Sequence, residues 1–186
     1  MKKILLPLFV AIIAIGISTS CKKTVKAIFP GAETDLPEFQ HDLPAIPQAA
    51  VGFDLPISVD QPFNFDSIVR VNTGNNFGAG DITSVRIKQL KLRITSGFDS
   101  VNNLSNFQSA SFKFSSNVTP TIAPVQVASI TFDTTYSIEK IIPGDGTPEL
   151  KPYLGGNILH YDIIAKVRRK TTKTLKISVI ATMLMK

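Results

Sequence analysis

Apolar and polar residues alternate along most of the chain beyond residue 48, and a period of two is typical of half-buried β-strands. The clearest run carries its apolar residues at every second position, at Val51, Phe53, Leu55, Ile57 and Val59. Pro56 lies in this run and has no backbone N–H to donate to a neighbouring strand. We therefore expect this first strand at the edge of a sheet.

The run that begins at Val85 changes the side on which its apolar residues lie. They stand at odd positions up to Ile87 and at even positions from Leu90 onward. A slip of one residue turns every later side chain to the opposite face of a strand. The change therefore predicts a β-bulge near Lys88 or a strand that crosses from one sheet to another.

The longest alternating runs lie at the end of the chain, at residues 161–167 and 175–183. With a turn around residues 170–173, they predict a long β-hairpin. Ile164 and Ile180 make the opposite faces of these strands partly apolar, so we expect the pair to be central, covered on both faces or part of an interface. Shorter runs predict further strands near residues 69–71, 110–114, 125–132 and 136–138.

About eight short strands, frequent turn residues and no segment with a convincing helical period predict an all-β fold. We expect an antiparallel β-sandwich of immunoglobulin-like or jelly-roll-like type. The alternative is a small β-barrel whose lumen binds lipid. With 186 residues, 44% of them hydrophobic and 18% charged, the chain fits a single globular domain with an N-terminal extension, and we assign residues 49–186 to the domain.

Residues 21–48 show no sustained period of 2 or 3.6, and they contain four prolines and four acidic residues. Such a composition predicts an extended, partly stiff tether in front of the domain. The alternative is a strip that binds a partner through its recurring apolar residues, Leu36, Phe39, Leu43 and Ile46.

The first 20 residues have the three-part layout of a secretory signal peptide. Two lysines follow Met1, residues 4–17 carry no charge, and small polar residues at 18–20 precede Cys21. The uncharged run is short for a transmembrane helix, which needs about 20 apolar residues. Cys21 is the only cysteine, so it forms no disulfide within the chain and no zinc site of the Cys₄ or Cys₂His₂ type.

This layout resembles the signal of bacterial lipoproteins. In that family the cysteine after the apolar run is linked to diacylglycerol, the preceding peptide is removed and the new N-terminus is acylated. The resemblance implies that residues 1–20 are removed and that Cys21 becomes the lipidated first residue, carrying fatty acids such as palmitate. Thr19 and Ser20 match the family pattern, whereas Ser18 stands where the family has Leu, Val or Ile.

The residue after the cysteine bears on location. In gram-negative members of the lipoprotein family, Asp at this position retains the protein at the inner membrane, and this chain has Lys22 instead. The resemblance therefore implies a lipid-anchored protein of the cell envelope, exported to the periplasm and held at the outer membrane of a gram-negative bacterium.

His160 and Asp162 are the candidate catalytic pair in the domain, because they share one face of a predicted strand. Neither a GxSxG nor an HExxH motif accompanies them, and an outward-facing pair of this kind is more often simply solvated. The loops at residues 73–81 and 143–149 contain the Asp, Asn and Gly of calcium or phosphate loops without the spacing of either, so turn chemistry explains them. We expect no enzymatic activity, no cofactor and no metal site.

The formal charge is +6, and +4 once Lys2 and Lys3 are removed with residues 1–20, which is too low to indicate nucleic-acid binding. Basic residues gather at the last predicted turn, at Arg168, Arg169, Lys170, Lys173 and Lys176. The cluster suggests contact with anionic lipid head groups, lipopolysaccharide phosphates or an acidic protein. The alternative is a solvated turn that keeps an exposed hairpin from pairing with another chain.

From the sequence we predict a lipid-anchored β-sandwich that acts in the cell envelope as a non-enzymatic binding or assembly module, with an unidentified partner. One alternative is a carrier of an apolar ligand, which requires an internal pocket of at least about 300 Å³ between the sheets. The other is a hydrolase built around His160 and Asp162, which requires a nucleophile within hydrogen-bond reach of the pair.

Overall fold

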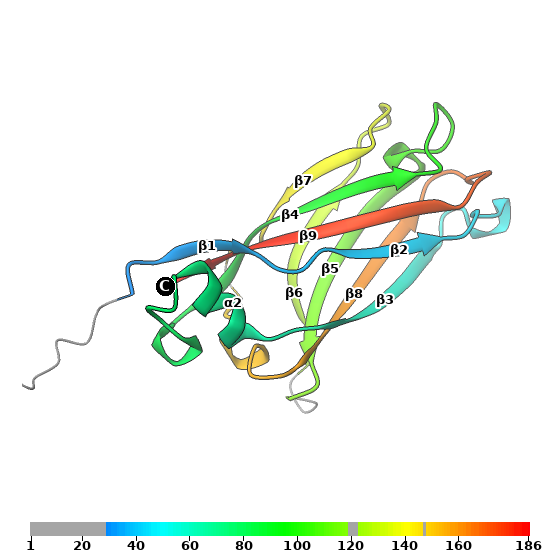
Figure 1. Cartoon of the computed structure of the whole chain (residues 1–186). Helices are drawn as coiled ribbons and strands as arrows, with labels where there is room; N and C mark the ends of the chain where they lie inside the picture. Colours follow the sequence, from blue (N-terminus) through cyan, green and yellow to red (C-terminus); the bar gives the residue numbers. More distant parts are fainter. Residues whose placement is uncertain (1–28, 119–122, 147) are drawn as a thin grey trace, which may run out of the picture.

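Nine β-strands form two antiparallel sheets in the part of the chain that the computed structural model describes, residues 29–118, 123–146 and 148–186 (Figure 1). In the first sheet, β1 (Ala32–Asp35) and β2 (Phe39–Leu43) both pair with β9 (Leu175–Met185), which is followed by β4 (Val85–Ser96) and β7 (Glu139–Pro143). The second sheet has the order β3 (Asp54–Pro62), β8 (Ile158–Val167), β5 (Phe107–Ser116) and β6 (Val125–Thr131). The predicted antiparallel sandwich is confirmed, and the alternative of a closed barrel is wrong because the described strands form two separate sheets.

The strands pair in a nested pattern, β2 with β9, β3 with β8, β4 with β7 and β5 with β6. This is the pattern of a jelly roll, in which one long hairpin is rolled into two facing sheets. Among the described strands from β2 to β9, the β5–β6 connection joins neighbours within one sheet, and the others pass from one sheet to the other. The jelly-roll-like type is therefore the one that the topology supports.

Successive connections lie at alternate ends of the sandwich (Figure 1). We call the end with helix α2 (Phe65–Asn72) and Lys186 the proximal end, and Phe29 lies beside Lys186 there. Four loops meet at the opposite, distal end, and they are the β2–β3 loop (44–53), the β4–β5 loop (97–106), the β6–β7 loop (132–138) and the β8–β9 loop (168–174). Short 3₁₀ turns complete the described elements, η1 (Gln48–Ala50), η2 (Ala79–Asp81), η3 (Leu104–Asn106) and η4 (Lys151–Tyr153).

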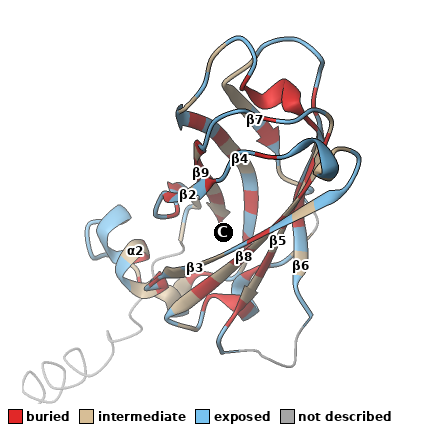
Figure 2. Cartoon of the chain, turned by 90° about the vertical axis from the view of Figure 1, so that its right-hand side faces the viewer, coloured by how far each residue is buried: buried red, intermediate tan, exposed pale blue. Residues whose placement is uncertain are grey.

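The core lies between the two sheets, where buried positions alternate with less buried ones along the strands (Figure 2). Phe112 and Phe114 of β5 point inward from the second sheet, and Ile177 and Val179 of β9 point inward from the first. Burial of a side chain of this size contributes about 1.5–3 kcal/mol. Alternation along the sequence thus corresponds to the buried face of each sheet.

The predicted C-terminal hairpin is wrong in its pairing. β8 and β9 are the expected strands and both are central, but β8 pairs with β3 and β5 whereas β9 pairs with β1, β2 and β4. Ile163 of β8 and Ile177 of β9 face the same small space in the core. Alternation identifies inward-facing side chains and does not distinguish two strands that pair from two that face each other across the core.

The bulge predicted near Lys88 is confirmed, because the register of β4 on β9 shifts between Ile87 and Gln89. A second irregularity lies on the other side of β9. From Asp35 to Phe39 the chain advances four residues, while the partner on β9 moves three, from 182 to 179. A further shift of β4 lies between Ile94 and Ser96, so β9 keeps a regular alternation while the strands on both sides of it take up the extra residues.

The tether predicted for residues 21–48 is wrong from residue 32 onward, where β1 and β2 form an interrupted edge strand of the first sheet. Its apolar residues are at most 3% exposed and belong to the core, namely Leu36, Phe39, Leu43 and Ile46. The partner-binding strip is wrong for the same reason. Pro37 lies between the two short strands, a position that needs no ladder hydrogen bond. The domain therefore begins near residue 32 rather than at 49.

Residues 65–72 form helix α2, although the sequence pattern predicted a strand at 69–71. The side chain of Asn64 caps the helix by accepting the N–H of Ser67 at 2.8 Å. Val69 is buried under the helix and Val71 is exposed on its outer side. The spacing of two between these valines therefore does not reflect a common strand face.

The predicted edge strand is confirmed, since β3 is the outer strand of the second sheet and contains Pro56. It begins at Asp54, however, so Phe53 stands in the loop before it and is 68% exposed. The strand predicted at 136–138 also starts later, because β7 begins at Glu139.

Candidate functional site

The distal end carries exposed apolar side chains on three of its four loops. Seven large hydrophobic residues are exposed in the described part of the chain, and four of them lie here, Phe53, Phe98, Val101 and Tyr136. Binding residues are commonly found on loops that a rigid scaffold positions, and grouped apolar side chains at a surface mark a place of contact. This end is therefore the candidate functional site.

Buried asparagines of the β4–β5 loop join it to the β8–β9 loop. The Oδ1 atom of Asn102 accepts the N–H of Thr172 at 2.7 Å. The Nδ2 group of Asn106 donates to the carbonyl of Lys170 at 2.8 Å, and its Oδ1 accepts the N–H of Asn103 at 2.9 Å. A buried polar network of this kind rigidifies its surroundings when its members have partners, so these loops are held in place.

Two arginines of the β8–β9 loop reach neighbouring loops through neutral acceptors. Nη1 of Arg168 donates to the carbonyl of Asp133 at 2.8 Å, and Nη2 donates to that of Phe132 at 2.6 Å. Nη2 of Arg169 donates to the carbonyl of Ser105 at 3.2 Å and to its hydroxyl. Both guanidinium groups are therefore held in position by acceptors that do not neutralise their positive charge.

The lysines of the predicted cluster differ in their surroundings. Nζ of Lys173 lies 2.7 Å from Oδ2 of Asp99, and Nζ of Lys176 lies 3.9 Å from Oδ1 of Asp42. The Lys173 hydrogen bond, with backbone N–H groups of the same loop, holds the pKa of Asp99 far below its usual range. Among the described residues, no carboxylate lies within ion-pair distance of Arg168, Arg169 or Lys170.

A groove of about 390 Å³ opens between the β2–β3, β4–β5 and β8–β9 loops. Val51 and Val101 contribute apolar surface to its lining, and Asn106 comes from the buried network. Its positive charge comes from the three residues that have no carboxylate partner, Arg168, Arg169 and Lys170. This distal groove thus combines apolar surface with positive charge that the fold holds in place.

His160 and Asp162 lie on the outer face of the second sheet and bind different residues of β3. Nδ1 of His160 is hydrogen-bonded to Oδ1 of Asp60, and Oδ1 of Asp162 accepts the hydroxyl of Ser58 at 2.7 Å. In the described part of the chain, no Ser or Thr hydroxyl is hydrogen-bonded to His160. The hydroxyl of Ser58 reaches Asp162 and not His160, the residue that would have to accept its proton, so these contacts differ from those of a catalytic triad.

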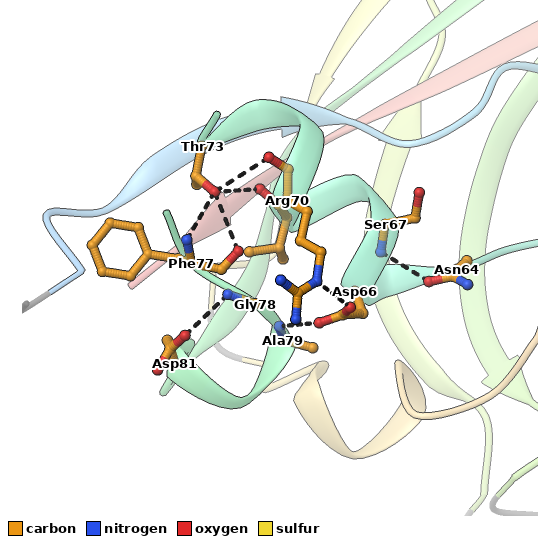
Figure 3. A network of polar contacts seen from close by, with 10 residues as sticks. Asn64, Asp66, Ser67, Arg70, Thr73, Phe77, Gly78, Ala79 and Asp81 are labelled. Carbon is orange, nitrogen blue, oxygen red and sulfur yellow. Dashed lines mark hydrogen bonds and ion pairs between the residues drawn. The ribbon is translucent and has the colours of Figure 1, made fainter. Parts of the chain in front are cut away.

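The glycine-rich loop after α2 uses its acidic groups to hold its own turn (Figure 3). Oδ2 of Asp66 pairs with Nε of Arg70 at 2.6 Å, and Oδ1 accepts the N–H of Ala79 at 2.9 Å. Asp81 accepts the N–H of Gly78 at 3.0 Å. These are the contacts of a helix end and a tight turn, as the composition of this loop suggested.

The space between the sheets is small. The cavity in the described core measures about 30 Å³ and is lined by apolar side chains, among them Ile57, Leu92 and Phe112. A pocket of this size is close to the volume that one water molecule occupies. It is about a tenth of what the carrier alternative requires.

Cys21 lies outside the described residues, so its predicted lipidation stays a prediction. No helix among the described residues has the length and apolar character needed to cross a membrane.

No protein-family model and no curated protein matches this chain. Among solved structures, the decameric BFDV capsid protein aligns with 15% identity and a TM-score of 0.38, covering 84% of this chain and 99% of that one. The 60-mer of BFDV capsid protein aligns with 13% identity and a TM-score of 0.31, covering 86% and 95%. Similarity this low supports no transfer of function.

Proposed function

We propose that this protein is a lipid-anchored protein of the bacterial cell envelope, at the outer membrane, whose jelly roll acts as a non-enzymatic binding or assembly module. The observation that carries the proposal is the position of Cys21 directly after an uncharged run and three small polar residues. Each buried CH₂ group contributes about 0.8 kcal/mol to membrane binding, so two or more acyl chains at Cys21 suffice for stable anchoring.

The position of the domain relative to such an anchor supports a role in binding. Seven residues separate Cys21 from Phe29, and this segment spans at most about 29 Å because a residue extends by no more than about 3.6 Å. Phe29 lines the same surface hollow as Met185 and Lys186 and so belongs to the proximal end. β9 has 11 residues and is therefore about 36 Å long. An anchor at Cys21 keeps the proximal end near the membrane and leaves the distal end free to reach a partner.

The chemistry of the domain also favours binding over transport. The distal end has exposed apolar side chains and a charged groove, while the described core has a cavity of about 30 Å³. These features are those of a surface that recognises another molecule.

The test of the anchor is Cys21→Ala, compared with Ser18→Ala as a matched control in the same signal. We expect the wild type and Ser18→Ala to incorporate a radioactive fatty acid and to sediment with membranes. Cys21→Ala should lose the label and leave the membrane fraction. Labelling that persists in Cys21→Ala would refute the anchor.

A second variant tests the location. Lys22→Asp supplies the residue that retains related lipoproteins at the inner membrane, so we expect it to move the labelled protein from the outer-membrane to the inner-membrane fraction. An unchanged distribution in a sucrose gradient would contradict the proposed sorting.

A further inference from the structure

We propose that the distal groove binds an acidic segment of a partner protein, with carboxylates against Arg168, Arg169 and Lys170 and an apolar side chain against Val51 and Val101. This inference rests on the proposed function as a binding module and names the class of its ligand. It divides the five basic residues of the cluster by their surroundings, which the sequence does not do.

Unpaired charge is the first argument. Lys173 and Lys176 have carboxylate partners, whereas the three cations of the groove have none within ion-pair distance among the described residues. A guanidinium has five N–H donors, and the carbonyl contacts of Arg168 and Arg169 use only some of them. Charge and donors therefore remain for a carboxylate, which Arg binds with favourable geometry.

Preorganisation is the second argument. The arginines are held by carbonyls of two other loops, and the backbone of Lys170 is held by the buried amide of Asn106. Ordering a flexible side chain on binding costs about 0.5–1.5 kcal/mol, and this groove avoids part of that cost. Arginines that served only to keep the surface soluble would not need such positioning.

The apolar surface distinguishes a protein segment from a simple anion. Val101 is 58% exposed and Val51 is partly buried beside the same groove, while Phe53 and Tyr136 stand exposed on neighbouring loops. Protein interfaces are enriched in aromatic residues and arginine. The volume of about 390 Å³ lies in the range of sites that bind small ligands or single side chains of a partner.

Position favours a protein over a lipid surface. The groove lies at the distal end of the domain, whereas Phe29, the first described residue, lies at the proximal end. An anchor at Cys21 therefore turns the groove away from the bilayer that holds the protein.

The experiment uses the lipidated protein purified in detergent micelles and a fluorescein-labelled peptide of alternating Glu and Phe, with alternating Gln and Phe as the uncharged control. We expect the acidic peptide alone to raise the fluorescence anisotropy. Lys170→Glu should weaken this binding about tenfold at low salt, because Lys170 is exposed, has no ion-pair partner among the described residues, and its reversed charge repels the carboxylates. The effect should shrink as salt screens the charges.

The matched control is Lys186→Glu, which makes the same change of net charge at the proximal end. We expect it to alter peptide binding less than about twofold. Equal weakening by both variants would show an effect of net charge and overturn the groove. Equal binding of the Gln and Glu peptides would also overturn the proposal. The same holds if the protein does not bind the peptide but binds phosphatidylglycerol vesicles in a way that depends on Lys170. The fatty-acid label is measured separately from peptide binding. A protein without the label would contradict the proposed anchor, whereas a labelled protein that does not bind the peptide would contradict only the proposed role of the groove.

Discussion

Replacing Tyr161 by Phe should make the protein more stable. Tyr161 lies on β8, is 5% exposed, and its hydroxyl has no hydrogen-bond partner among the described residues. Its ring packs between Phe39 and Phe114, with centroid distances of 4.7 and 4.6 Å. Phenylalanine keeps both ring contacts, so the substitution changes only the hydroxyl.

The magnitude follows from the loss of hydration. A hydroxyl that is buried without a hydrogen bond costs about 1–3 kcal/mol, because water solvates it in the unfolded chain. We expect Tyr161→Phe to raise the free energy of unfolding by about 1–2 kcal/mol. For a domain of this size, 1 kcal/mol shifts the midpoint of thermal unfolding by about 2–4 °C.

The assay is urea unfolding at pH 7, with Tyr153→Phe as the matched control. Tyr153 is also buried, but its hydroxyl donates to the carbonyl of Ala123 at 3.1 Å. Its removal should therefore lower the free energy of unfolding by about 1 kcal/mol. The reasoning is refuted if both variants lose stability alike, since Tyr161 would then have a partner such as a buried water.

The same hydroxyl predicts a pH effect. Burial raises the pKa of Tyr161 well above its ordinary value of 10.0. The unfolded chain therefore releases this proton first, and stability that is complete below pH 10 is lost as the pH rises beyond it. The stability advantage of Tyr161→Phe should grow from pH 10 upward, and an advantage that stays constant would contradict the burial.

Three further substitutions test the fold. Phe39→Ala should lower the free energy of urea unfolding by about 3–5 kcal/mol because Phe39 is a core residue. Val71 is exposed, so Val71→Ala should change it by less than about 0.5 kcal/mol. Equal effects of the two substitutions would instead support a tether at residues 32–43. Gly97 has φ +80°, and a Cβ there overlaps the carbonyl of Thr174, so Gly97→Ala should cost at least about 2 kcal/mol more than Gly52→Ala, which has φ +87° and open space. Asn106→Ala should cost about 1–3 kcal/mol by the same method and accelerate hydrogen exchange in the distal loops, because the buried N–H of Asn103 and the carbonyl of Lys170 lose their partner.

Alternation predicted the fold class because each strand has one buried face. Alternation also located the bulge at Lys88, where the buried side changes parity. The edge position of β3 followed from a different signal, the missing backbone N–H of Pro56. Both features are local, since one residue and its neighbours contain the whole signal.

Two errors came from local signals that were present but outweighed by others. Asn64 is a helix cap, and the pair Asp66 and Arg70 has the i, i+4 spacing of a helix, yet Val69 and Val71 suggested a strand. In residues 21–48 the four prolines suggested a tether, although Pro37 separates two short strands whose apolar residues are buried. Short edge strands tolerate proline because one side of their backbone needs no partner.

The sequence located the basic residues of the distal site, but it could not show which of them have carboxylate partners and which do not. Lys173 is paired with Asp99 and Lys176 with Asp42, residues that lie 74 and 134 positions earlier in the chain. No local pattern encodes such distances. The asparagines of the β4–β5 loop carry no local signal of burial, because it is their contacts with the β8–β9 loop that bury them.

The place of this site follows from the topology itself. Strands β2 to β9 run antiparallel to their partners, so successive connections must lie at opposite ends. The β2–β3, β4–β5, β6–β7 and β8–β9 loops therefore share the distal end, although the chain enters β1 and β2 from the proximal end. The path of the chain therefore places the groove around Arg168 at the opposite end of the domain from Phe29, the first described residue. With the lipid anchor that we propose at Cys21, these four loops would face away from the membrane.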